Sequence, residues 1–200
     1  VTAAKLNDNV ISGQTALTSS PDDTDELLIS DAGTIKRIDV SLVGGKNTPA
    51  FFAYRSGSTQ AATDDTATKV QFNGEIFDTD NTFDSSTNYR FTPGVSGKYH
   101  LSSHVRATMD TQQKGINGQM AIYKNGSVFI QSKPFDFYTS GYGGIASSWG
   151  CTIDCILDSD ADDYFEVYVW VNTASGDITF LNSGATDIRS WFQGYKLIGV

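Results

Sequence analysis

Cysteines, histidines and long apolar runs are scarce in this 200-residue sequence, which contains two cysteines and two histidines. Cys151 and Cys155 lie in a stretch whose apolar residues alternate as they do in a β-strand. On a strand that rises ~3.3 Å per residue the two residues are roughly 13 Å apart, which is too far for a disulfide. We therefore expect two buried free thiols that pack as small apolar side chains.

The lack of long apolar runs and the shortage of basic residues exclude two classes of partner. The longest unbroken apolar run, residues 167–171, is far shorter than the roughly 20 residues that cross a bilayer, so we expect no membrane insertion. The formal net charge is −9, and binding a polyanion needs a basic surface that such a chain does not supply. We therefore expect no nucleic acid partner.

Motifs for catalysis and for transition-metal binding are also missing. His100 and His104 share one face of a predicted strand, too far apart to chelate one metal within a chain, so hydrogen-bonded structural histidines are expected. The sequence has neither a G-x-S-x-G elbow nor an H-E-x-x-H motif. We predict no enzymatic activity, no catalytic residues and no cofactor-binding residues. The 23 acidic residues nevertheless leave a carboxylate pair for sugar cleavage open.

Calcium is the metal for which the sequence offers ligands. Two acidic stretches, residues 78–84 and 158–163, supply carboxylates densely enough for a hard cation. Neither stretch has the Gly and Glu of an EF-hand loop, and Asp or Asn closing a turn between strands is the favoured explanation of both. The candidate calcium ligands are Asp78, Asp80, Asp84, Asp158, Asp160 and Asp162.

Composition and periodicity predict an all-β protein. Glycine occurs 19 times, aromatic residues make up 12% of the chain, and no amphipathic helix exceeds about two turns. Asn125-Gly126 is a strong hairpin signal, since both residues tolerate positive φ. Short strands at regular spacing are typical of a sandwich or jelly roll. The predicted strands are residues 51–54, 69–77, 89–92, 98–109, 120–123, 128–131, 147–157 and 164–171.

The strand predicted at residues 164–171 is apolar on both faces. Phe165 and the valines that follow it lie on one face, and Tyr164, Tyr168 and Trp170 lie on the other. A strand of this kind needs two burial surfaces. One of these surfaces is the core, and the other has to be a second contact.

A tight turn and an alternating strand in residues 91–105 resemble the F-x-x-x-x-P-G-x-Y-x-F-x-x-H signature of the globular head of complement component one q. That head is a jelly roll related to tumour necrosis factor. The positions that match are Phe91, Gly97, Tyr99, Leu101 and His104, with Leu101 in place of the family's aromatic residue and Ser96 in place of its proline. Further segments resemble the family in the same order, namely 49–54, 70–78, 120–126, 140–141 and 192–195.

The resemblance implies a ten-stranded, trimeric jelly-roll sandwich over residues 47–200. It also implies a subunit contact around a three-fold axis, to which we assign Tyr164, Tyr168 and Trp170. Some members of the family hold calcium near the trimer apex, which keeps calcium open as a cofactor.

Residues 1–46 differ from the rest of the chain and have few large side chains. They contain two apolar runs that predict a hairpin joined at Asp31-Ala32-Gly33. The segment has too little apolar area to order alone, so we predict a stem or linker that depends on trimer formation. Residues 1–9 and 22–31 resemble linker repeats in tail-fibre proteins of bacterial viruses. This resemblance implies a location on the virion surface, with other virion proteins as partners of the stem.

Aromatic residues also gather in residues 133–142, which should form a loop between strands. Phe135, Phe137, Tyr138 and Tyr142 are the predicted receptor contacts, because aromatic faces beside Asp, Ser and Thr suit a glycan or protein surface. Packing of these rings on the sandwich is the alternative. We predict a non-enzymatic, trimeric virion fibre head that binds a host-surface glycan or protein. A structural head or neck decoration that only caps the fibre, and a glycan-cleaving spike, are the two alternatives.

Overall fold

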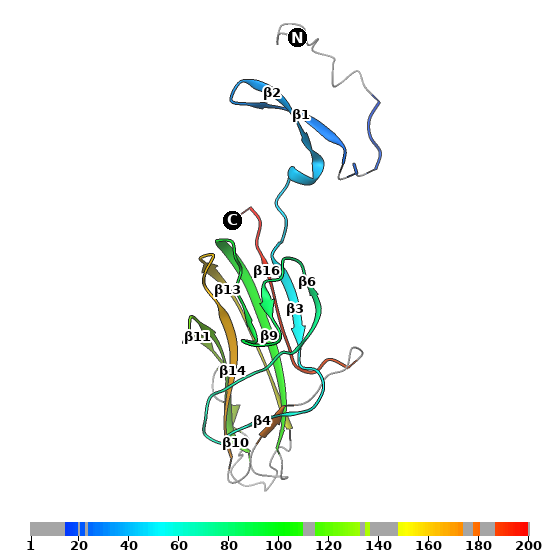
Figure 1. Cartoon of the computed structure of the whole chain (residues 1–200). Coiled ribbons are helices and arrows are strands. Elements are labelled where there is room, and N and C mark those ends of the chain that lie inside the picture. Colours follow the sequence, from blue (N-terminus) through cyan, green and yellow to red (C-terminus); the bar gives the residue numbers. More distant parts are fainter. Residues whose placement is uncertain are drawn as a thin grey trace. The chain divides into compact units, whose positions relative to one another are not determined.

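The chain separates into two compact units, Val1–Gly45 and Lys46–Val200. Figure 1 shows the computed structural model of the whole chain. It describes residues 15–19, 21–22, 24–109, 115–132, 135–136, 148–173, 178–180 and 187–199.

The described residues of the N-terminal unit form one antiparallel hairpin. Strand β1 (Glu26–Asp31) pairs with β2 (Thr34–Asp39), and a 3₁₀ turn, η2 (Val40–Leu42), follows. The hairpin turn at Ala32 and Gly33 takes positive φ values of 48° and 84°, as expected from the sequence. None of the described residues of this unit is buried, and Leu28 is 74% exposed. A two-stranded hairpin without a covered apolar face is marginal by itself.

The C-terminal unit, which we call the head, is a sandwich of two seven-stranded antiparallel sheets. The β14 sheet has the order β11-β10-β14-β8-β7, with β12 paired to β10 and β5 paired to β14. Its strands are β5 (Thr68–Lys69), β7 (Phe83–Asp84), β8 (Arg90–Phe91), β10 (Gly115–Lys124), β11 (Ser127–Gln131), β12 (Phe135–Asp136) and β14 (Phe165–Thr173).

The β9 sheet has the order β4-β15-β9-β16-β3-β6, with β13 paired to β9. Its strands are β3 (Ala50–Tyr54), β4 (Gln60–Ala62), β6 (Gly74–Asp78), β9 (Gly97–Met109), β13 (Ser148–Ser159), β15 (Ile178–Phe180) and β16 (Trp191–Lys196). The expected all-β sandwich is thus confirmed. The sheets hold more strands than the ten expected, because two-residue strands such as β7 and β8 extend them.

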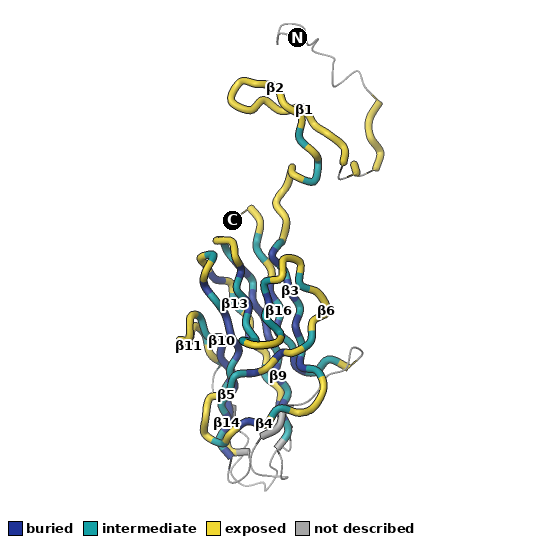
Figure 2. The backbone as a smooth tube through the Cα atoms, in the orientation of Figure 1, coloured by how far each residue is buried: buried dark blue, intermediate teal, exposed yellow. Residues whose placement is uncertain are grey.

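The core lies between the two sheets and follows the alternation of the long strands (Figure 2). Phe51 is fully buried at its centre, with ring centroids 4.5 Å from Phe91 and 5.0 Å from both Phe83 and Phe192. Every second residue of β9 and β14 points to this aromatic cluster, since side chains of a strand alternate between faces. Other buried members are Val70, Phe72, Tyr99, Leu101, Val105, Met120, Ile122, Phe165, Val167 and Val169.

One predicted strand is divided between the two sheets. The sequence predicts a continuous strand over residues 69–77, but β5 pairs with β14 and β6 pairs with β3. The segment between them crosses the edge of the sandwich, with Val70 and Phe72 fully buried. Burial of alternate residues therefore continues through the crossing although the pairing partner changes.

The Asn125-Gly126 hairpin is confirmed. Asn125 and Gly126 take φ values of 53° and 77° between β10 and β11. The described residues contain no helix long and apolar enough to cross a membrane.

Candidate functional site

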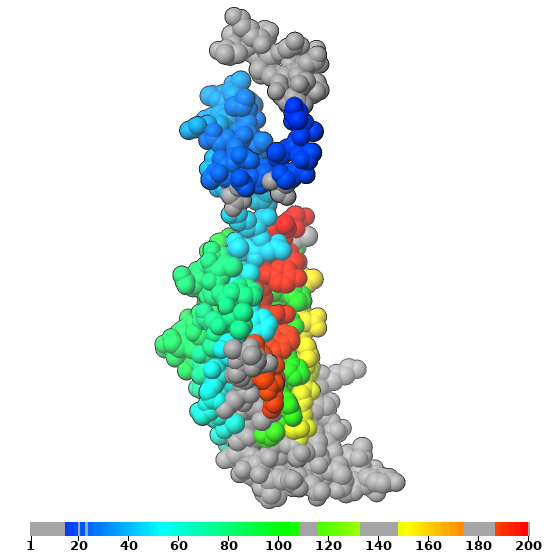
Figure 3. Space-filling view, turned by 90° about the vertical axis from the view of Figure 1, so that its right-hand side faces the viewer, coloured from blue at the N-terminus to red at the C-terminus, as the bar shows by residue number. Residues whose placement is uncertain are grey.

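The open side of the β9 sheet carries two groups of rings and aliphatic side chains, and the polar residues Ser102, Asp154 and Gln193 lie between the groups. We call the two groups together the aromatic face. Figure 3 looks on to it, with β3 (cyan), β16 (red), β9 (green) and β13 (yellow) side by side. Phe77 lies opposite Phe52 in the β3–β6 register. For the other members, neighbours along the same strand point into the core. The members of the aromatic face are Phe52, Phe77, His100, His104, Ile156, Trp191 and Tyr195.

Ring contacts connect most of the aromatic face. The ring centroid of Phe52 lies 6.5 Å from that of Phe77 and 5.9 Å from that of Trp191, and Trp191 stacks on His104 at 6.3 Å. The side chains of Ile156, Phe77 and Tyr195 are 63%, 48% and 36% exposed. Exposed apolar side chains gathered on one face make it a candidate interaction surface.

The two histidines of the sequence both lie on the aromatic face. The ring centroid of His100 lies 5.2 Å from that of Tyr195, and its buried Nδ1 has no hydrogen-bond partner in the described part of the chain. His104 Nδ1 lies 2.8 Å from Thr152 Oγ1. Burial, and then the nearby Arg106 guanidinium, lower the pKa of His104 from its ordinary value. The neutral form of the His104 imidazole is therefore favoured.

Two of the three residues assigned to the trimer contact lie on the open side of the other sheet. Tyr168 packs against Tyr123 with ring centroids 4.1 Å apart, and Trp170 Nε1 donates to Asp65 Oδ1 at 3.0 Å. Tyr164 precedes β14, and the Arg90 guanidinium lies 4.3 Å from its ring centroid. A trimer contact at these residues stays a prediction.

In the first acidic stretch the carboxylates act as turn acceptors. Asp78 accepts the backbone N–H of Phe83 at 2.7 Å and the Thr82 hydroxyl at 3.1 Å. Asp84 accepts the N–H of Thr87 at 2.8 Å, and this bond is the largest cause of its lowered pKa. Turn chemistry, the alternative to calcium, accounts for both residues. Asp80 accepts the neighbouring Thr79 hydroxyl at 3.0 Å.

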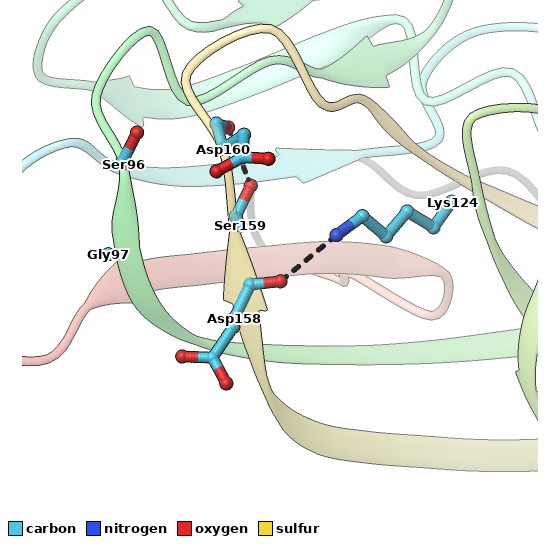
Figure 4. Close-up of a pocket in the computed structure, with 6 residues that line it drawn as sticks. All are labelled: Ser96, Gly97, Lys124, Asp158, Ser159 and Asp160. Atoms are coloured by element: carbon cyan, nitrogen blue, oxygen red, sulfur yellow. Dashed lines mark hydrogen bonds between the residues drawn. The ribbon is translucent and has the colours of Figure 1, made fainter.

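The second acidic stretch borders a hollow of about 310 Å³ between β10 and β13. Figure 4 shows that Lys124 Nζ donates to the Asp158 carbonyl oxygen, at 3.1 Å, while the Asp158 carboxylate points away from Lys124 and Asp160. Asp162 lies in the turn that follows. Among the residues described, no three His, Cys, Asp or Glu side chains are gathered to hold a metal ion.

Asp163, which the sequence analysis did not single out, is the buried carboxylate of this region. Burial alone raises its pKa, but the Lys124 ammonium, the Asn125 amide and the Asp160 N–H all donate to it and together lower the pKa to about 2. The carboxylate therefore joins the β10–β11 hairpin to the β13–β14 turn.

Both cysteines are free and pack against the core. Burial raises the pKa of the Cys151 thiol, and burial with the nearby Asp154 carboxylate raises that of Cys155 to about 11. Both thiols are therefore protonated and poor nucleophiles at neutral pH.

Three of the four predicted receptor contacts, Phe137, Tyr138 and Tyr142, lie outside the described residues. The fourth, Phe135, belongs to β12, whose backbone pairs with β10 at Gly118. Of this segment, the structure therefore places Phe135 and Asp136, whose backbone extends the β14 sheet.

No protein-family model and no curated protein matches the sequence. Solved structures with a matching fold include Eiger, a TNF from S. frugiperda, with a TM-score of 0.51 and 12% identity over 76% of this chain and 93% of that one. Murine APRIL at pH 5.0 has a TM-score of 0.51 and 10% identity over 74% and 98% of the two chains. The globular domain of the zebrafish complement 1qA protein has a TM-score of 0.47 and 16% identity over 75% and 98%.

At these identities the likeness shows the fold alone. The head is a jelly-roll sandwich of the kind found in tumour necrosis factor-like domains, as the sequence resemblance implied.

Proposed function

We propose that the head forms a homotrimer through the aromatic face and acts as a non-enzymatic binding module. The observation that carries the proposal is the gathering of rings and an isoleucine in two neighbouring groups on this face, one of Phe52, Phe77, His104 and Trp191 and one of His100, Ile156 and Tyr195. Water contact with this area is unfavourable, and a second and third copy of the same face would remove it. The trimeric state that the family resemblance implied supports the same assembly.

The chemistry of the described side chains supports binding rather than catalysis. His104 is bonded to a threonine hydroxyl, and in the described part of the chain neither histidine hydrogen-bonds a carboxylate. The two thiols have raised pKa values. A general base or activated nucleophile would need the opposite arrangement.

The place of action that we propose is the surface of a virion. The N-terminal unit has no buried residue among those described and exposes Leu28 and Leu42. Together with the resemblance of residues 1–9 and 22–31 to tail-fibre linkers, this supports a stem that is completed by its trimer mates. A trimeric head on such a stem would present three equal sites to a host cell, and their combined binding exceeds that of one site.

Measuring the particle mass by light scattering tests the assembly. The full chain should have the mass of three copies, and Ile156→Asp should reduce it to one copy, because a carboxylate would be buried in the contact. Tyr168→Asp is the matched variant on the opposite sheet and should leave three copies. A monomeric wild type would overturn the proposal. Dissociation by the Tyr168 substitution alone would instead favour the contact predicted from the sequence.

Binding of the labelled trimer to intact candidate host cells tests the role. Saturable binding supports the receptor function. A trimer that binds no host favours the structural cap, since the aromatic face alone accounts for assembly. Release of oligosaccharide from host polysaccharide would favour the glycan-cleaving alternative.

A further inference from the structure

The open side of the β14 sheet contains a hollow of a different chemical character from the aromatic face. It has a volume of about 420 Å³ and is lined by Asn117, Gln119, Tyr123 and Trp170, with Ala67 beside them. A smaller hollow of about 50 Å³ adjoins it over Ala121, Gln131 and Tyr168. We call the two together the amide-aromatic hollow. Its size falls within the ~300–1,000 Å³ of small-ligand sites.

Small residues between large ones create this hollow. In the β10–β14 register Gln119 lies opposite Trp170, and Ala121 lies opposite Tyr168. Ala121 and Ala67 leave space that the neighbouring rings border, because a methyl side chain does not reach the height of an indole or phenol ring. A register shift between Ile122 and Tyr123 accompanies this arrangement at the β11 edge.

Contacts outside the hollow hold its walls in place. Trp170 Nε1 donates to Asp65 Oδ1 at 3.0 Å, and the rings of Tyr123 and Tyr168 lie 4.1 Å apart. Gln119 Nε2 donates to the carbonyl oxygen of Ser132 at 2.8 Å. The aromatic groups are therefore preorganised, which lowers the entropy cost of binding.

One polar atom at the hollow has no partner. Asn117 Oδ1 is buried and accepts no hydrogen bond within the described part of the chain. A buried acceptor without a donor is unfavourable unless something else supplies one. A ligand hydroxyl would satisfy it once the Asn117 amide turns toward the hollow, because the oxygen has no accessible surface in the free protein.

The charges around the hollow favour an uncharged ligand. All of its described lining side chains are neutral. The Lys69–Glu166 ion pair, whose carboxylate accepts from the Tyr168 hydroxyl, is internally compensated at 2.7 Å. The Asp65 carboxylate beside Trp170 adds a negative charge. The whole chain has a net charge of −9, which disfavours anions.

From the geometry we infer that the amide-aromatic hollow binds a neutral saccharide. The C–H face of a pyranose ring packs on Trp170, its edge contacts Tyr123, and one of its hydroxyl groups donates to Asn117 Oδ1. Rings and amides combined in this way match both the apolar and the polar parts of a sugar. The inference rests on the proposed binding function, and it places the receptor site beside the predicted aromatic segment, since β12 pairs with β10 at Asn117.

A glycan array probed with the intact, labelled full chain tests the ligand class. The neutral set contains oligosaccharides of glucose, galactose, mannose and N-acetylglucosamine, and the anionic set contains sialylated and sulfated oligosaccharides. We expect binding in the neutral set. Binding confined to the anionic set, or absent from both, overturns the inference.

Titration of the best neutral oligosaccharide by calorimetry tests the site. Trp170→Ala should weaken binding by about tenfold or more, and Asn117→Ala by about threefold to tenfold. Asn117→Ala should leave the unfolding midpoint unchanged or higher, because the lost acceptor has no partner among the described residues. Phe129→Ala, an exposed ring on β11 outside the hollow, is the matched control and should bind within about twofold of wild type.

The outcomes separate this inference from the proposed function. Host cells bound equally well by wild type and by both hollow variants would retain the receptor function and overturn the saccharide site. Binding to neither cells nor glycans would overturn both. A loss in the Phe129 control as large as in Trp170→Ala would also overturn the site.

Discussion

Each of the two open faces of the sandwich is the outer side of a seven-stranded antiparallel sheet. The faces differ in what their outward residues can bind. The aromatic face has rings and isoleucine at its surface, with Ile156 63% exposed. The open side of the β14 sheet combines rings with amides, and the Lys69–Glu166 ion pair there is largely buried, since Glu166 is 5% exposed. A broad apolar surface is suited to a protein partner, whereas a small mixed hollow is suited to a polar small molecule.

Breaking the buried Lys69–Glu166 ion pair should produce the largest difference in stability between the two faces. Lys69→Met leaves the Glu166 carboxylate buried without its cation and should cost about 2–3 kcal/mol of unfolding free energy. Lys98→Met, which removes the exposed pair with Asp158 on the β9 sheet, should cost less than about 1 kcal/mol. Urea unfolding of both variants measures the difference.

The double variant Lys69→Met/Glu166→Gln controls for lost packing. It should recover most of the stability, because the carboxylate is no longer charged. Equal effects of the Lys69 and Lys98 substitutions would contradict the contrast between the faces.

Mild acid should affect the aromatic face and leave the hollow unchanged. His104 has a pKa below its ordinary value of 6.5, so the folded state prefers the neutral ring. Its contribution to stability is complete above about pH 6.5 and is lost as the pH falls below that value toward the lowered pKa, by no more than about tenfold in the folding constant per pH unit.

Urea midpoints at pH 7.5 and 5.5 measure this loss. In His104→Gln, which keeps a hydrogen-bonding side chain that does not titrate, the difference between the two pH values should shrink. Asp163 does not contribute in this window, because its pKa is about 2. An unchanged pH dependence in the variant would show that the histidine environment is not the cause.

The smallest effect is expected from a single hydroxyl on the hollow side. Tyr168→Phe removes the O–H that donates to Glu166 Oε2 over 3.4 Å, and the long distance limits the loss to about 0.5 kcal/mol. Thermal unfolding of the variant checks this value. A loss above about 2 kcal/mol would mean that the hydroxyl belongs to a tighter network than its geometry indicates.

Local patterns predicted much of the sandwich. The alternation in residues 98–109 and 147–157 corresponds to β9 and β13, and Asn125-Gly126 marked its hairpin, because each signal depends on neighbours in sequence. The crossing between the sheets at Val70 and Phe72 was missed. Alternation of apolar residues shows which side of a strand is buried, but it does not show which strand is its hydrogen-bonded partner.

The candidate sites were harder to predict, because they form across strands. Gln119 meets Trp170 only through the β10–β14 register, and Phe52 meets Trp191 only through the β3–β16 register. The two residues of each pair are far apart in sequence, so no sequence motif contains both of them. Two-sided apolarity of residues 164–171 did indicate that Tyr168 and Trp170 contact more than the core.

The position of β16 has a consequence for synthesis on the ribosome. Residues 191–196 fill the place between β3 and β9 and pair with both. Until they emerge, those two strands cannot be joined through hydrogen bonds, and each presents an unpaired edge. The head therefore completes its β9 sheet only after translation has passed residue 196, and a chain stopped before β16 would expose two adhesive edges to chaperones, proteases and other nascent copies.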